Sequence, residues 1–78
     1  MPLSVAPLCV DLKIQKVSTD GKTKKHLESL GLTINSTLKL ITVSDGNSIV
    51  EVKNGRLALD RNIATKISVL PLLTEVIR

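Results

Sequence analysis

The feature that most constrains this chain is the complete absence of Phe, Tyr and Trp from its 78 residues. Leucine, isoleucine and valine together supply 28 residues, so any hydrophobic core must be aliphatic. A domain of this size buries roughly 60% of the surface that its unfolded chain exposes, so we expect modest stability. Two common binding modes are also excluded, because proline-rich ligands and single-stranded nucleic acids dock on aromatic side chains.

The rest of the composition excludes several further classes of protein. A charged fraction of 23% with so many branched aliphatic residues is not typical of a disordered chain. One cysteine allows neither an internal disulfide nor a cysteine-based zinc cage, and one histidine allows no two-histidine metal motif. The net charge of +4 permits attraction to acidic partners, although an ordinary solvated surface is the favoured explanation.

No segment indicates export or membrane insertion. The first eight residues contain two prolines and no basic residue, unlike a secretory signal. No stretch approaches the roughly 18–20 apolar residues of a transmembrane helix. We therefore expect the protein to be cytoplasmic.

Alternating apolar residues and turn signals predict a chain of short β-strands. Val17 falls out of phase with the first alternating run, which indicates a bulge or bend. Asp45-Gly46, within the loop 44–48, and Asn54-Gly55 are strong hairpin signals. The predicted strands cover residues 10–14, 37–41, 49–53, 56–60 and 68–70, with Pro71 stopping the last one.

Two helical segments are predicted between these strands. Residues 22–30 form a short helix, with Leu27 and Leu30 three positions apart and Gly31 at the left-handed C-terminal position. The start of this helix is poorly defined, because capping by Asp20 places Gly21 in the first turn. A single helical turn over residues 61–66 is capped by Asp60.

Together these elements predict a mainly β fold: a small, curled antiparallel barrel of about five strands. One short α-helix lies between the first two strands, and the helical turn precedes the last strand. We expect one domain over residues 1–78, with its core at about 3–70. The apolar tail 71–78 must pack on the barrel, contact a partner, or fray.

The order of these features resembles the FeoA family, small cytoplasmic proteins of ferrous iron transport with an SH3-like barrel. The resemblance covers roughly residues 3–69. It is carried by the basic helix ending in Leu30-Gly31-Leu32 and by the run Gly55-Arg56-Leu57-Ala58-Leu59. Family members often carry Pro-Gly where this chain has Leu8-Cys9 and Ile34-Asn35, a difference that concerns loop conformation more than the fold.

The resemblance implies function by association with the membrane ferrous iron transporter FeoB, which family members are thought to bind or regulate. It implies no enzymatic activity, and no nucleophile elbow or Walker A pattern occurs in the sequence. We accordingly predict a non-enzymatic interaction module with no cofactor. The alternative is a free-standing SH3-like domain that binds RNA, which only the basic residues favour.

Metal chemistry has little support in the sequence. Cys9 is interpreted as a small hydrophobic residue entering a strand, and His26 as a surface residue. The alternatives are a metal ligand or redox sensor for Cys9 and a metal ligand or pH-sensitive contact for His26. Asp45, Glu51 and Asp60 are too scattered for a carboxylate cluster. We predict no metal site.

The densest basic run lies on the predicted helix and suggests a partner-binding surface. A solvated helix face is the alternative interpretation. Positive charge beside leucine would combine electrostatic steering with a small apolar anchor. The candidate partner-binding residues are Lys22, Lys24, Lys25, His26, Leu27 and Leu30, with Gly31 and Gly55 as structural turn residues.

Overall fold

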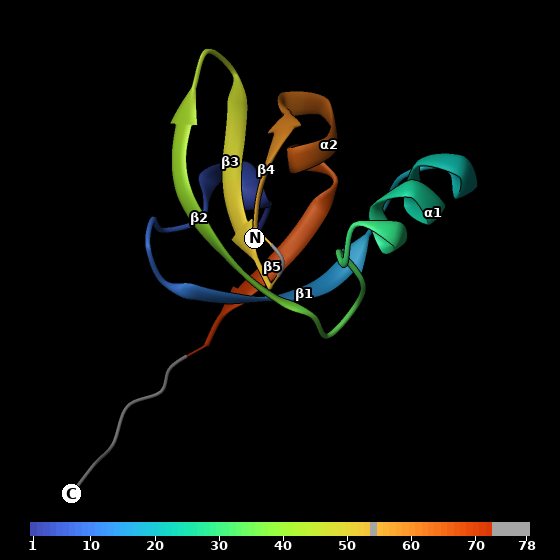
Figure 1. Cartoon of the computed structure of the whole chain (residues 1–78), viewed down its shortest axis with the longest axis horizontal. Helices are drawn as coiled ribbons and strands as arrows, with labels where there is room; N and C mark the ends of the chain where they lie inside the picture. Colours follow the sequence, from blue (N-terminus) through green and yellow to red (C-terminus); the bar gives the residue numbers. More distant parts are fainter. Residues whose placement is uncertain (54, 73–78) are drawn as a thin grey trace, which may run out of the picture.

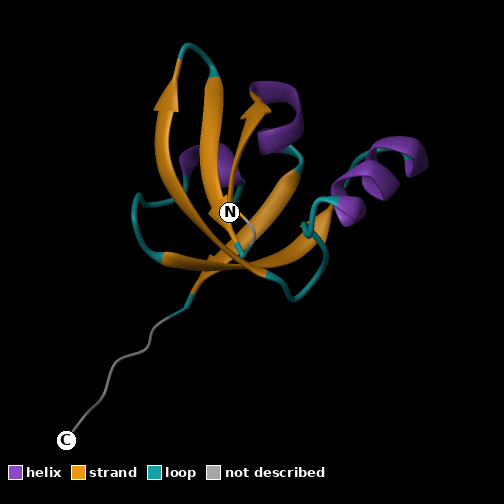
Figure 2. Cartoon of the chain, in the orientation of Figure 1, coloured by secondary structure: helices purple, strands orange, loops and turns teal. Residues whose placement is uncertain are grey.

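A computed structural model describes residues 1–53 and 55–72. Within this part of the chain, five antiparallel strands form one sheet in the order β4-β3-β2-β1-β5 (Figure 1, Figure 2). The predicted mainly β fold is confirmed, with a helix between the first two strands and another before the last. The strands are β1 (Asp11–Val17), β2 (Thr37–Ser44), β3 (Asn47–Val52), β4 (Gly55–Asp60) and β5 (Ile67–Pro71), and the helices are α1 (Gly21–Ser29) and α2 (Arg61–Thr65).

The sheet is strongly bent but is not closed into a ring. β4 pairs with β3 and β5 pairs with β1, and no register joins β4 to β5 in the described chain. Gln15 is the extra residue where the β1–β5 register shifts, which confirms the bulge inferred from Val17. A second shift occurs at Ile41 between β2 and β3. Bulges of this kind increase local bending and twist, and they let the sheet wrap around an aliphatic core.

The first hairpin is tighter than the sequence suggested, and the second turn falls one residue earlier than predicted. Ser44 pairs with Asn47, so only Asp45 and Gly46 form the first turn, both with positive φ. These are the conformations that a two-residue hairpin needs. In the second hairpin Val52 pairs with Gly55, so Gly55 follows the turn as the first residue of β4, with φ of 140°. Asn54, the other half of the predicted turn, lies outside the described residues.

The amino-terminal segment is an element that the sequence did not reveal. Residues Leu3–Val5 form a 3-10 turn, η1, with Leu3 fully buried. The backbone of Met1 bonds twice to Val69, donating through its amino group and accepting from the Val69 N–H. The β5 strand is therefore held between β1 on one side and the start of the chain on the other.

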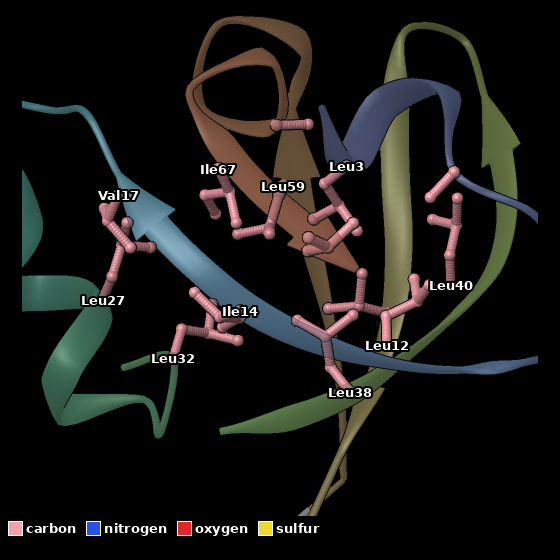
Figure 3. Close-up of a cluster of buried hydrophobic side chains, with 14 residues drawn as sticks. Leu3, Leu12, Ile14, Val17, Leu27, Leu32, Leu38, Leu40, Leu59 and Ile67 are labelled. Carbon is pink, nitrogen blue, oxygen red and sulfur yellow. The ribbon is translucent and has the colours of Figure 1, made fainter. Parts of the chain in front are cut away.

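The core lies inside the bend of the sheet and is entirely aliphatic among the described residues (Figure 3). Every strand contributes to it, as do both helices and η1. Val52, Leu57 and Ile63 pack at its margin. The buried members are Leu3, Ala6, Leu12, Ile14, Val17, Leu27, Leu32, Leu38, Leu40, Val50, Leu59, Ala64, Ile67 and Val69.

Local capping fixes both ends of α1. The Asp20 carboxylate accepts a hydrogen bond from the Thr23 N–H at 2.8 Å, so Asp20 is the N-cap and Gly21 begins the helix. At the other end the Leu32 N–H donates to the Leu27 carbonyl at 2.9 Å, and Gly31 has φ of 91°. This is the Schellman ending, and it confirms the conformation predicted for Gly31. Asp60 caps α2 through the Ile63 N–H, again as predicted.

Two loop residues other than glycine adopt left-handed conformations outside the hairpin turns. Cys9 has φ of 61° and Asn35 has φ of 76°. The Cys9 N–H donates to the Leu40 carbonyl at 2.7 Å, and the Asn35 N–H donates to the Ile14 carbonyl at 2.8 Å. Tertiary hydrogen bonds thus hold both residues in a region that usually favours glycine.

Candidate functional site

Helix α1 projects from the side of the sheet and is anchored through one face (Figure 1). Leu27 is its only buried residue, 1% exposed, and lies beside Val17 (Figure 3). The side chains of Lys22, Lys25 and His26 are exposed. Most of the helix surface, and most of its positive charge, therefore faces solvent.

The two leucines of the predicted site have different surroundings. Leu27 is in the core and stabilises the helix against the sheet, so it is not available to a partner. Leu30, the C-cap residue, is half-buried and presents part of its side chain at the surface. The apolar contribution of α1 to a binding surface thus comes from Leu30.

Lys24 does not share a hollow with this leucine. It is half-buried and lines a hollow of about 240 Å³ together with Glu28, Val17 and Ile34. Leu30 lines hollows on the other side of Leu27. The predicted set therefore divides into exposed Lys22, Lys25 and His26, a flanking Lys24, and Leu30 at the helix end.

The hollows beside Leu30 contain residues that sequence reasoning missed. One, of about 360 Å³, is lined by Leu30, Ser36, Val52 and Lys53, among others. A neighbouring hollow of about 190 Å³ is lined by Ser29, Leu30, Gly55, Arg56 and Leu57, with Val52 shared between the two. The available signal was weak: Val52 and Leu57 alternate like core residues, and only the curvature of the sheet leaves them half-exposed.

Cys9 and His26 do not form part of a metal-ligand cluster within residues 1–53 and 55–72. No group of three or more His, Cys, Asp and Glu side chains is assembled there. Cys9 is an exposed free thiol in the loop before β1, and His26 is exposed on α1. The expectation that the protein binds no metal stays a prediction.

One carboxylate in this region has a displaced pKa. Hydrogen bonds from the side chain and then the backbone N–H of Thr23 lower the pKa of Asp20 below its usual value of 3.8. The charged form of Asp20 is thereby favoured at the positive end of α1. Asp20 thus contributes to the start of the helix that carries the exposed lysines.

In the part of the chain that the structure describes, no helix is both long and apolar enough to span a bilayer.

A bent five-stranded sheet with a helix inserted after its first strand defines a small SH3-like domain. The family model for the FeoA domain matches residues 1–71. A curated protein of Methanocaldococcus jannaschii named "Putative Fe(2+) transport protein A" is 31% identical over 68 residues, covering 87% of this chain and 83% of that protein.

Solved structures agree with this match. The crystal structure of the iron uptake regulatory protein FeoA superimposes with a TM-score of 0.81 at 25% identity, covering 92% of this chain and 96% of that one. The FeoA protein of Chlorobium tepidum gives a TM-score of 0.86 at 23% identity, covering 97% of this chain and 74% of that one. The chain belongs to the FeoA family, whose members are related to ferrous iron transport.

Proposed function

We propose that this chain is a non-enzymatic, cytoplasmic accessory protein of ferrous iron uptake that binds the cytoplasmic part of a FeoB-type transporter. Membership of the FeoA family supports the association with iron transport. We choose α1 as the binding surface because it projects from the sheet. It exposes Lys22, Lys25 and His26 and buries only Leu27.

The charge distribution supports a role for this helix in docking. Within the described residues only Lys39 and Arg56 form ion pairs, both weak ones at 3.8 Å, so the α1 lysines have no internal carboxylate partner. Positive charges on a projecting helix attract an acidic surface over about one Debye length. Once the surfaces meet, half-buried Leu30 adds an apolar contact at the helix end.

The test is binding of the purified protein to detergent-solubilised transporter from the same source. Reversing the charge at Lys22 and Lys25 should slow association and flatten its salt dependence, because peripheral charges act mainly on association rate. Measuring between about 0.1 and 1 M salt is informative, since the Debye length falls from roughly 10 to 3 Å over this range.

A matched control changes the same number of charges elsewhere. Lys16→Glu with Arg61→Glu gives the same net charge from two exposed basic residues outside α1. Equal effects from the two double variants would mean that overall charge, not the helix, governs binding. No binding by the wild-type protein would contradict direct association itself.

A further inference from the structure

The strand β4 leaves one backbone edge without a partner in the described chain. β4 pairs only with β3, and the sheet is open between β4 and β5. Because hydrogen-bonded residues alternate along an antiparallel ladder, every second residue of β4 directs its N–H and C=O away from β3. Such an edge is a ready template for an added strand.

Of the two hollows beside Leu30, the one of about 190 Å³ is lined by the first three residues of β4. Gly55, Arg56 and Leu57 line one side of the hollow of about 190 Å³, and Ser29 and Leu30 at the end of α1 line the other. The edge is therefore accompanied by a recess with apolar side chains. In this respect it differs from a bare strand edge.

The charges around the recess have one sign. The residues lining the two hollows beside Leu30 include Lys53 and Arg56 and no acidic side chain. Glu51 approaches Arg56 at 3.8 Å, but both side chains remain well exposed, so the pair is weak. A third hollow shares Lys53 with the first of these and is lined also by Asp11 and Glu51, so acidic side chains border the positive region on that side.

We propose that the recess between the end of α1 and β4 binds an extended peptide segment in which acidic and apolar residues alternate. An added strand pairs its backbone with the β4 edge. Its successive side chains then fall on opposite faces, beside Leu57 on the inner face and beside exposed Arg56 on the outer face. An apolar residue suits the first position and a carboxylate suits the second.

This inference shares Leu30 with the proposed transporter-binding surface, but it depends on the ligand chemistry of β4 and not on the lysines of α1. A short acetylated peptide of alternating glutamate and valine is titrated into the full-length, isotope-labelled protein, and amide chemical shifts are followed by NMR. We expect saturable shifts concentrated on Leu30, Gly31 and residues 55–57, with a dissociation constant of about 1 mM or tighter. A peptide of alternating lysine and valine should give none.

Matched variants test each half of the recess. Arg56→Gln should weaken binding about two- to fivefold, the range for an exposed charge pair, while Lys16→Gln should leave it unchanged. Leu30→Ala should weaken it about fivefold through lost apolar contact. Leu70→Ala is the control, since Leu70 is 48% exposed on β5 and does not line these hollows.

Three results would overturn the proposal. The first is the absence of saturable shifts at millimolar peptide, or shifts located away from β4. The second is equal binding of an oligothymidylate at the same amides, which would make the site a general polyanion surface. The third is a concentration-dependent shift of the β4 amides without peptide, which would assign the edge to a second copy of this chain.

Discussion

Replacing Cys9 with glycine should stabilise the protein. Cys9 is exposed and held at φ of 61° by the hydrogen bond from its N–H to the Leu40 carbonyl, and the substitution keeps that bond. An L-residue in the left-handed region costs roughly 1–2 kcal/mol. Glycine removes this strain but adds about 0.4–1 kcal/mol of unfolded-state entropy. The difference is a gain of about 0.8 kcal/mol, between extremes of roughly 0 and 1.6.

The assay follows from the composition. With no aromatic residue the protein has no intrinsic fluorescence to report unfolding, so far-ultraviolet circular dichroism in urea and calorimetry under reducing conditions are the suitable methods. For a domain of this size about 0.8 kcal/mol corresponds to a rise in melting temperature of roughly 3–6 °C.

Cys9→Ala is the control that isolates the backbone effect. It removes the same thiol but keeps a Cβ, so we expect it to lie within about 0.5 kcal/mol of the wild type, as surface substitutions usually do. Cys9→Gly must then be the more stable of the two variants. If alanine is more stable than glycine at this position, the strain at φ of 61° is smaller than the entropy cost of glycine and the reasoning fails.

Three other predictions follow from features described above. Gly31→Ala should cost about 1 kcal/mol in urea unfolding, because φ is 91° and the space for a Cβ is open, so the backbone strain of about 1–2 kcal/mol is offset only by the lower unfolded-state entropy of alanine; an unchanged midpoint would contradict this. Folding lowers the pKa of Asp20, so the ionised side chain contributes to the stability of the folded protein. This contribution is complete above the usual pKa of 3.8 and is lost as pH falls through the lower pKa of the folded state. The difference in free energy of unfolding between wild type and Asp20→Ala should therefore become smaller at acid pH. A difference that does not change with pH would contradict this role of Asp20. Finally, calorimetric titration with Fe²⁺ or Zn²⁺ should show no tight stoichiometric binding; binding that disappears in Cys9→Ser or His26→Ala would refute this.

Local patterns were sufficient to predict most elements of the sheet. Period-2 alternation located the strands, Asp-Gly located the first hairpin, and the phase slip at Val17 located the bulge at Gln15. Asp20 and Gly31 mark the two ends of α1 through contacts within the helix itself. These features depend on neighbours in sequence, which is why the sequence reveals them.

Features that depend on distant contacts were missed. The burial of Leu3 and the pairing of Met1 with Val69 arise only when the two ends of the fold meet, and the first residues have no periodic pattern. For the candidate site, sequence spacing grouped Leu27 with Leu30. In the structure Leu27 enters the core while Leu30 lies beside the β3–β4 hairpin, and these tertiary contacts do not follow from helical spacing alone.

The position of β5 between β1 and the first residues sets the order of events during synthesis. β1 has its β5 partner only after roughly 50 further residues have been made, which takes about 3–10 s at about 5–20 residues per second. Until then Met1 also has no Val69 with which to form its hydrogen bonds. The residues of the β2–β3 and β3–β4 hairpins are therefore synthesised before β5 can pair on either side. A chain that ends before Ile67 therefore has an unpaired β1 edge and lacks the core side chains of Ile67 and Val69.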